Sequence, residues 1–533
     1  MIKTINLKNS EVKVEKLGGD NTEILNNSGG TVYASKLPNI TVGGDEVIAI
    51  PPGAIDGLYG THETVYLLGT GSVEVRGVDR EINTVRCGTA SGGLEIFSEY
   101  VDEKCSETLD SAKEYADSLH AELARYIGYA DNDVYGLEAD FENCVFTRLA
   151  GAVGKTAGAD FDSVNAYGGR RRCNLSDDGE VLAYYGDEDF KADGSNGQVM
   201  VEQPKFYYRV VPLKTEKIDG ADGYHLRKAR YYISDTPKSG FKVHPAFVRN
   251  GVEADRIYLS AFEGSIYDTS AGEYLLNDEQ IADFDNDKLS SIAGAKPCSG
   301  LTQALTRSNA RLLAHNRGSG WEQSYMATVS ATELLLAIEY ATFNIQTILG
   351  TGNTVQSSVT LNTQNTGKTE CLGNVSGAVF DDDSISFIAY RGEENFYGNI
   401  WAWVDGGNNF NATSISNYGE IYVADHGFMD NINSMSYKDT GIRPCSVKGY
   451  ISAFGYSEEF DWLFVATECK GNDSVPIGDC LWNDLPGWRT AAFGGCRNYG
   501  ESAGAFCWTL NNSSTVHNQI IGARLVYFSV SAI

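Results

Sequence analysis

Short apolar runs alternate with polar residues in the first hundred residues, and glycine-rich turns separate these runs. The β-branched and aromatic residues that favour strands gather at 31–33, 46–50, 64–68 and 72–75. Gly-Gly, Pro-Pro-Gly and Gly-Thr-Gly sequences stand between the runs and predict turns. We therefore predict a small all-β domain over residues 1–100.

Residues 106–128 follow a different pattern, because this segment has no proline, no internal glycine and many alanine, glutamate and leucine residues. Its apolar side chains recur at alternating gaps of three and four, which is the spacing of a heptad seam. The seam consists of Leu109, Ala112, Ala116, Leu119, Leu123 and Tyr126. We predict a short helical stem over residues 101–130 that self-associates as a trimeric coiled coil. The alternative is a single helix packed on its own domain, since the seam covers only about two and a half heptads.

The chain becomes polar and turn-rich after this segment. Residues 131–200 contain Asp-Gly and Gly-Gly turns, so we expect a loop-rich connector there. A strand at 203–213 then opens the last region, residues 201–533, which closes on an apolar strand at 520–530. The pattern therefore predicts a multidomain protein whose largest domain is the C-terminal one.

Two helices are predicted inside this last region. The first runs near 307–316, with Thr306 as its N-cap and Gly318 at its end. The second begins at Ser330, which has the capping-box spacing to Glu333. Two early helices in a long region bracketed by strands predict an α+β architecture for residues 201–533.

The charge balance excludes two classes of partner. The chain has 42 Lys and Arg against 71 Asp and Glu, which gives a net charge of −29. Such a surface repels phosphates and anionic lipids, so we expect no nucleic-acid partner. No run approaches the eighteen or so apolar residues of a membrane span, so no membrane insertion is expected. The N-terminal residues lack the apolar stretch of a signal peptide, which predicts synthesis in the cytoplasm.

The residues that usually carry chemistry are present but not in catalytic or metal-binding patterns. The eleven cysteines are scattered without a CxxC pair, which favours reduced, buried thiols. Asp283, Asp285 and Asp287 have the spacing of a calcium loop, but Lys288 and Gly294 stand where that loop needs Gly and Glu. The seven histidines form no pair at metal spacing. We predict no catalytic residue, no metal and no cofactor.

The closing segment, residues 487–528, combines apolar strand-like positions with clusters of small polar residues and tyrosine. Tyr, Ser, Asn and Gly are the residues that adaptable binding loops favour. Tyrosine gives rigid contact area, and the small polar residues give versatile hydrogen bonding. The segment therefore predicts a recognition surface on a rigid scaffold.

Five stretches of the last region carry a resemblance to a known family. They are PKFYYRV (204–210), SGFKVHPAFVRNG (239–251), NRGSGWEQSYMATVSATELLLAIEYATFN (316–344), YRGEENFYGNIWAWVDG (390–406) and the closing GG…AGAF…NNSS…IGARLVYF. In order and spacing they resemble the C-type-lectin-like fold of the formylglycine-generating-enzyme type found in phage receptor-binding proteins. Within that group the chain is similar to the variable proteins of diversity-generating retroelements. Residues 1–200 resemble, more loosely, the stem of a phage tail fibre.

The resemblance implies that the last strands and loops present a variable ligand-binding surface. The residues placed there are Trp482, Asn483, Arg497, Asn498, Tyr499, Glu501, Ser502, Thr509, Asn511, Asn512, Ser513, Ser514, His517 and Asn518. Tyr499, at a loop tip, is the strongest single candidate, and Arg524 is expected to be a framework residue beneath the surface. The run Asn511–Ser514 has an alternative as a structural turn whose side chains cap the backbone.

These features predict a phage tail receptor-binding protein, or adhesin, that is part of the virion and binds a bacterial surface protein or glycan. We expect a homotrimer whose N-terminal region attaches to other phage tail proteins. One alternative is an enzyme of the formylglycine-generating type, or one that acts on surface glycans, with Cys496 and Cys507 as its thiols. Another alternative is a structural tail or decoration protein without a host ligand.

Overall fold

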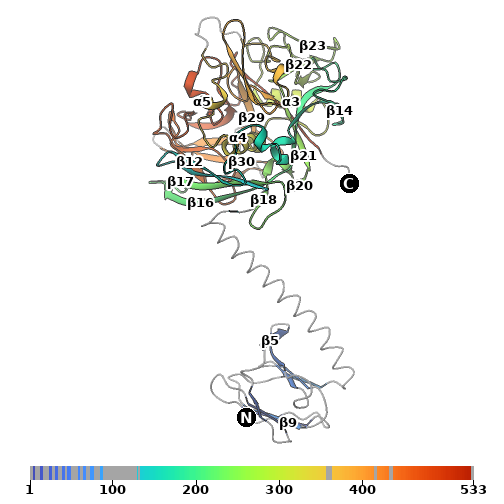
Figure 1. Cartoon of the computed structure of the whole chain (residues 1–533), viewed down its shortest axis with the longest axis vertical. Coiled ribbons are helices and arrows are strands. Elements are labelled where there is room, and N and C mark those ends of the chain that lie inside the picture. The colour runs from blue at the N-terminus through green and yellow to red at the C-terminus, as the bar shows by residue number, and fades with distance from the viewer. Residues whose placement is uncertain are drawn as a thin grey trace. The chain divides into compact units, whose positions relative to one another are not determined.

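The computed structural model forms two compact units, Met1–Leu119 and His120–Ile533 (Figure 1). In the first unit it describes the backbone of short strands between residues 4 and 87. In the second it describes residues 129, 133–355, 363–412, 417–430 and 436–529. The predicted helical stem at 106–128 lies outside the described residues.

The N-terminal unit contains two five-stranded sheets. The first sheet comprises β1 (Thr4–Asn6), β2 (Lys13–Glu15), β3 (Glu23–Asn26), β4 (Thr31–Tyr33) and β9 (Ser72–Arg76). The second comprises β5 (Asn39–Val42), β6 (Asp45–Ala49), β7 (Leu58–Gly60), β8 (Thr64–Leu67) and β10 (Thr84–Cys87). The four strands predicted from the sequence coincide with β4, β6, β8 and β9, so those predictions are confirmed.

Three large sheets build the C-terminal unit. A seven-stranded sheet comprises β11 (Val134–Asp140), β12 (Val145–Ala150), β16 (Tyr207–Lys217), β17 (Tyr224–Ser234), β18 (Lys242–Val243), β33 (Ala453–Tyr456) and β34 (Ala466–Glu468). A six-stranded sheet comprises β13 (Arg171–Leu175), β14 (Val181–Tyr184), β15 (Gln198–Pro204), β21 (Arg256–Ser260), β25 (Trp321–Gln323) and β39 (Leu525–Phe528). An eight-stranded sheet comprises β29 (Trp401–Asn411), β30 (Glu420–Val423), β31 (Lys438–Asp439), β32 (Lys448–Tyr450), β35 (Cys480–Trp482), β36 (Gly487–Phe493), β37 (Trp508–Asn512) and β38 (Ile521–Gly522).

Smaller elements complete this unit. The short strands are β19 (Val248–Arg249), β20 (Val252–Glu253), β22 (Ser265–Asp268), β23 (Glu273–Leu275), β24 (Lys288–Ser290), β26 (Gly377–Phe380), β27 (Ser386–Tyr390) and β28 (Glu393–Glu394). The α-helices among the described residues are α2 (Asn165–Gly168), α3 (Arg307–His315), α4 (Met326–Tyr340) and α5 (Gln346–Leu349). Single 3₁₀ turns are η2 (Ala159–Phe161), η3 (Pro245–Phe247), η4 (Glu370–Leu372) and η5 (Gly500–Ser502).

The fold class predicted from the sequence is wrong. The described part of the chain is 36% strand and 12% helix, and it contains no coiled-coil stem. The C-terminal region is therefore a mostly-β unit rather than the α+β C-type-lectin-like domain that the resemblance implied. Many of its strands are two to five residues long, which is too short to show the alternation by which a strand is recognised in a sequence.

The segment expected to be a connector, residues 131–200, belongs to the C-terminal unit. It supplies β11 and β12 to the seven-stranded sheet and β13, β14 and the first three residues of β15 to the six-stranded sheet. Strand β11 pairs with β17 over its full length, from Val134 opposite Ser234 to Asp140 opposite Lys228. The Asp-Gly turns of residues 131–200 connect strands, and the Gly-Gly pair ends helix α2. The C-terminal unit therefore begins well before residue 201.

The two predicted helices are both present, but only the first begins where the sequence indicated. Helix α3 starts at Arg307, and the Thr306 hydroxyl accepts a hydrogen bond from the Asn309 amide at 3.3 Å, which confirms this N-cap. Helix α4 starts at Met326, four residues before the predicted start at Ser330. At this start the Tyr325 amide donates to Thr328 Oγ1 at 3.1 Å.

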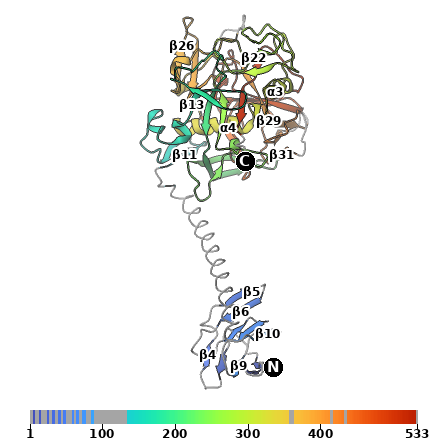
Figure 2. The same ribbon diagram turned by 90° about the vertical axis from the view of Figure 1, so that its right-hand side faces the viewer.

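Helix α4 lies inside the C-terminal unit, as two views at right angles show (Figure 1; Figure 2). Every residue from Met326 to Glu339 is buried. A helix that is buried on every face needs partners on all sides, and strands of the seven- and eight-stranded sheets contact it. The helix thus forms the centre of the main hydrophobic core, to which Phe343, Phe454 and Phe506 also belong.

Candidate functional site

A ladder of aromatic rings runs from the core to the surface at one edge of the eight-stranded sheet. Trp401 on β29 meets Tyr499 edge to face, with ring centroids 5.4 Å apart. Tyr499 meets Trp482 on β35 at 5.0 Å, and the Lys448 ammonium lies 3.5 Å from the Trp482 ring centroid. Trp401 is buried, Tyr499 and Trp482 are half-buried, and Lys448 is exposed. The ladder therefore anchors the loop that carries Tyr499 to two strands of the sheet.

The first loop on this ladder comprises residues 498–502. The Tyr499 amide donates to the Cys496 carbonyl at 3.0 Å, and the Ser502 amide donates to the Tyr499 carbonyl at 3.1 Å. Burial raises the pKa of the Tyr499 phenol to about 12, so the phenol is neutral at physiological pH. Asn498 and Glu501 are exposed on this loop.

The second loop comprises residues 511–520, at the end of β37. The Val516 amide donates to the Ser513 carbonyl at 3.0 Å, and the Ile520 amide donates to Asn518 Oδ1 at 3.0 Å. The Gly300 amide donates to the Asn518 carbonyl at 2.9 Å. A Cβ atom on Gly300 would lie 2.4 Å from the Asn518 nitrogen, so this approach requires glycine. Thr515, His517 and Gln519 are exposed, while the backbone between them is fixed.

We call the surface formed by residues 498–502, residues 511–520 and Trp482 the loop face. Val516 and Ile520 pack from the second loop against the same apolar cluster that Tyr499 and Trp482 contact. Both loops therefore pack against the same apolar cluster. The predicted residues that lie on this surface, exposed or half-buried, are Trp482, Asn498, Tyr499, Glu501, Ser502, Asn511, Asn512, Ser513, Ser514, His517 and Asn518.

The structure distinguishes between the two roles that the sequence left open for the run Asn511–Ser514. Asn511 Oδ1 accepts hydrogen bonds from the backbone amides of Asp484 and Leu485, at 2.9 and 3.1 Å. Its Nδ2 donates to Asp484 Oδ1 at 2.6 Å. Asn511 is thus a structural residue that holds the neighbouring connection, and Ser513 begins the turn that leads to the exposed residues.

Three predicted contact residues are buried, and the prediction is corrected for them. Asn483 Oδ1 accepts from the side-chain amides of Asn409 and Asn411, at 2.9 and 2.8 Å. Arg497 is fully buried and donates to Thr363 Oγ1 at 2.9 Å. Thr509 is 7% exposed, in a strand between two neighbours. Their polar side chains led to a surface assignment, but Asn483 and Arg497 have their hydrogen-bond partners beneath the surface.

The framework role predicted for Arg524 is confirmed. Arg524 is buried, and its guanidinium donates to the carbonyls of Ser260 and Glu394, at 3.2 and 2.9 Å. Three residues of the site were missed from the sequence. Thr515 and Gln519 belong to the same polar run as the predicted residues and could have been included. Lys448 gave no sequence signal, because its place depends on the pairing of β32 with β35.

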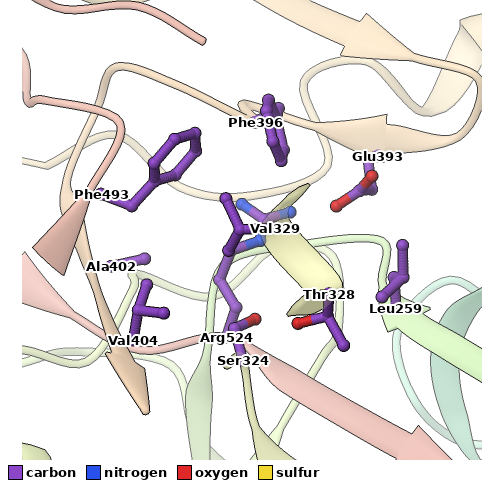
Figure 3. Close-up of a pocket in the computed structure, with 10 residues that line it drawn as sticks. All are labelled: Leu259, Ser324, Thr328, Val329, Glu393, Phe396, Ala402, Val404, Phe493 and Arg524. Carbon is purple, nitrogen blue, oxygen red and sulfur yellow. The ribbon is translucent and has the colours of Figure 1, made fainter. Parts of the chain in front are cut away.

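A small cavity lined by buried residues lies beside Arg524, and Figure 3 shows the Arg524 guanidinium and the Glu393 carboxylate among the lining side chains. Its volume is about 20 Å³. A single water molecule needs a cavity of about 10–15 Å³, so this space has room for a water but not for an organic substrate.

A larger, open depression of about 530 Å³ lies near β13 and β15. Its two arginines, Arg171 and Arg256, both form ion pairs with Glu202, at 3.3 and 2.6 Å. Both arginines are thus already engaged by Glu202, and we consider the depression a weaker candidate than the loop face.

The thiols of the enzymatic alternative are poorly placed for nucleophilic chemistry. Cys496 and Cys507 are both fully buried. Burial raises the pKa of Cys496 to about 12 and that of Cys507 well above its usual range, which disfavours the reactive thiolate. The described residues contain no group of three potential metal ligands, and no helix among them is long and apolar enough to cross a membrane.

Comparison of the sequence with models of protein families, and with curated proteins, gave no match.

Proposed function

We propose that this chain is a phage tail receptor-binding protein that attaches to a bacterial surface protein or glycan through the loop face. The observation that supports this proposal is a group of exposed polar side chains on loops whose backbone is held by the framework. These side chains are Asn498, Glu501, Thr515, His517 and Gln519. Because the loops are already ordered, little conformational entropy is lost when a ligand binds.

The chemistry of the loop face is suited to hydrogen bonding. Amide, hydroxyl and imidazole groups offer both donors and acceptors, and Glu501 is the one acidic side chain among these five exposed positions. Tyr499 adds a half-buried aromatic surface beside Trp482. Glycans and polar protein surfaces present matching hydroxyl, amide and carbonyl groups.

The same proposal assigns attachment to the virion to the N-terminal unit. The N-terminal unit attaches to other phage tail proteins, and the protein is a homotrimer on the virion. Several loop faces on one particle act together through their effective concentration, so that modest affinity at each face is sufficient for stable attachment.

The test is adsorption of phage particles that carry substitutions on the loop face. Asn498→Ala, Thr515→Ala, His517→Ala and Gln519→Ala, introduced together, should reduce adsorption to the host by at least about tenfold, since a few contact residues usually carry most of the binding energy. Re-randomising the same positions should redirect adsorption to other strains.

Matched control substitutions are available on β16, in the seven-stranded sheet. Thr215 and Lys217 are both exposed, and Thr215→Ala with Lys217→Ala should leave adsorption unchanged. Unchanged adsorption of the loop-face variant would contradict the proposal. Loss of particle assembly with the loop-face variant alone would instead favour the structural decoration protein.

A further inference from the structure

Two thiols of the C-terminal unit are in direct contact. The Sγ atoms of Cys445 and Cys469 lie 3.1 Å apart. Both residues are free cysteines in the structure. A disulfide has an S–S length of about 2 Å, so a movement of roughly 1 Å brings the two sulfur atoms to bonding distance. Among the described cysteines, this is the pair whose sulfur atoms touch.

The pair lies where two sheets meet. Cys469 follows directly after β34, which belongs to the seven-stranded sheet. Cys445 lies just before β32, at the edge of the eight-stranded sheet. The Cys445 amide donates to the Ala466 carbonyl of β34 at 3.3 Å, and the Cys445 carbonyl accepts from Asn483 Nδ2 at 3.1 Å. The backbone around Cys445 is therefore already held between both sheets.

We propose that Cys445 and Cys469 form a redox latch, in which a low-molecular-weight disulfide oxidises the two thiols to a disulfide that joins the two sheets. The latch does not depend on the function proposed above. It does fix the strand pair β32–β35, which carries Lys448 and Trp482 of the aromatic ladder.

The reaction is a double thiol–disulfide exchange. The Cys469 thiolate attacks one sulfur atom of oxidised glutathione, and the other glutathione leaves as a thiolate that takes up a proton. The Cys445 thiolate then attacks the Cys469 sulfur of this mixed disulfide and releases the second glutathione. The protein loses two electrons and two protons, and oxidised glutathione gains them.

The exposure of the two residues sets the order of these steps. Cys469 is half-buried and Cys445 is buried, so an oxidant in solution reaches Cys469 first. The contact with Cys445 and burial both raise the pKa of the Cys469 thiol, so its thiolate is scarce at neutral pH. We therefore expect a slow reaction, which accelerates about tenfold per pH unit as the thiolate fraction grows.

Peptide mapping of the full chain after treatment with oxidised glutathione tests the latch. Trypsin cleaves after Lys438, Lys448 and Lys470 but not between Arg443 and Pro444, so the two cysteines fall on separate peptides, 439–448 and 449–470. We expect these peptides to be joined by a disulfide that reductant removes. The exposed Cys144 and Cys371 report, as glutathione adducts, that the oxidant has acted.

Two cysteine variants distinguish the Cys445–Cys469 disulfide from a disulfide with Cys480 and from simple glutathione adducts. Cys480 is the other cysteine close to Cys469, and Cys480→Ser should leave the linkage intact. In Cys445→Ser the mixed disulfide cannot be resolved, and a stable glutathione adduct on Cys469 is expected. Adducts on Cys144 and Cys371 without the 445–469 linkage would overturn the proposal. A linkage between Cys469 and Cys480 in the unsubstituted chain would overturn it as well, and neither outcome requires a variant to fold.

Discussion

Strand β37 connects the buried core to the loop face, and polar side chains have different roles in these two regions. At its beginning, Trp508 Nε1 donates to Glu333 Oε1 on α4 at 3.1 Å, in the fully buried core. At its end, Asn511 on the loop face holds the neighbouring connection through the amides of Asp484 and Leu485. In the core, Trp508 and Glu333 fix each other's side chains through this hydrogen bond. On the loop face the backbone is fixed, and the exposed side chains remain available. This difference implies that stability and recognition are carried by separate residues.

Glu339 is the clearest example of a polar side chain that is fixed in the core. Its carboxylate accepts from Arg391 Nε and Nη2, from the Tyr390 hydroxyl and from the Gly158 amide, each at 2.8 Å. Glu339 is fully buried, and Arg391 is 5% exposed. These donors offset the free-energy cost of burying a charged carboxylate, and removal of the cationic donor leaves that cost uncompensated.

The largest effect is therefore expected from Arg391→Met. This change leaves the Glu339 carboxylate buried without its cation and should lower the free energy of unfolding by about 3–5 kcal/mol. Urea unfolding followed by tryptophan fluorescence measures the loss. The matched control is Lys438→Met, because the Lys438–Glu459 ion pair lies on the surface at 2.7 Å, with both side chains more than half exposed. The control should cost less than about 1 kcal/mol, and equal losses would refute the distinction.

The next effect is a pH dependence that arises from Glu263. This buried carboxyl accepts hydrogen bonds from the side-chain amides of Asn395 and Asn399, at 3.0 and 2.9 Å. Burial raises the pKa of Glu263 to about 7, against about 4.3 in an unfolded chain. Between these values the folded state binds more protons than the unfolded state. The free energy of unfolding therefore falls as the pH rises from about 4.3 to about 7.

Substitution of Glu263 removes this contribution. Glu263→Gln keeps the shape of the protonated carboxyl without its titration, so the decline in stability between pH 5 and pH 8 should become shallower. Urea midpoints at both pH values provide the measurement. Glu501→Gln, on the exposed loop 498–502, is the matched control and should retain the decline of the unsubstituted protein. A Glu263 variant with an unchanged slope would assign the pH dependence to another group.

A smaller effect is expected at the boundary between the two regions. Asn511→Ala removes the acceptor of the Asp484 and Leu485 amides, which are then satisfied only by water. We expect a loss of about 1 kcal/mol in the free energy of unfolding, because these hydrogen bonds are close to solvent. Ser513→Ala should cost less, since the Ser513 hydroxyl meets only the exposed Thr515 hydroxyl, at 3.1 Å. Equal costs would mean that Asn511 has no special structural role.

The sequence predicts correctly those features that depend only on residues close together in the chain, such as helix caps and short strands. Thr306 caps α3 as its spacing to the helix indicated, and the N-terminal strand runs coincide with strands. Ser330 and Glu333 have the spacing of a capping box but lie inside α4, because the chain already turns into the helix at Tyr325. Tyrosine is not a common capping residue, so no local rule favoured that start.

Other features of the site depend on contacts between residues that are far apart in the chain, and the sequence does not predict these contacts. The resemblance implies a surface position for Asn483, yet its partners, Asn409 and Asn411, are more than seventy residues away in the chain and hold it in the interior. The pairing of β35 with both β32 and β37 likewise places Lys448 on Trp482. A polar residue in a glycine-rich segment has the same local pattern whether it is exposed or satisfied by distant partners.

The smallest effect on stability is expected at the tips of the loop face. Thr515→Ala, His517→Ala and Gln519→Ala, combined, should change the free energy of unfolding by no more than about 0.5 kcal/mol. The bonds that hold this loop are made by other groups, namely the backbone of Ser513 and Val516 and both the side chain and the carbonyl of Asn518. Urea unfolding of this variant, beside the adsorption assay, measures both properties on one protein. A loss above about 1 kcal/mol would place these side chains in the framework, and the separation between stability and recognition along β37 would then fail.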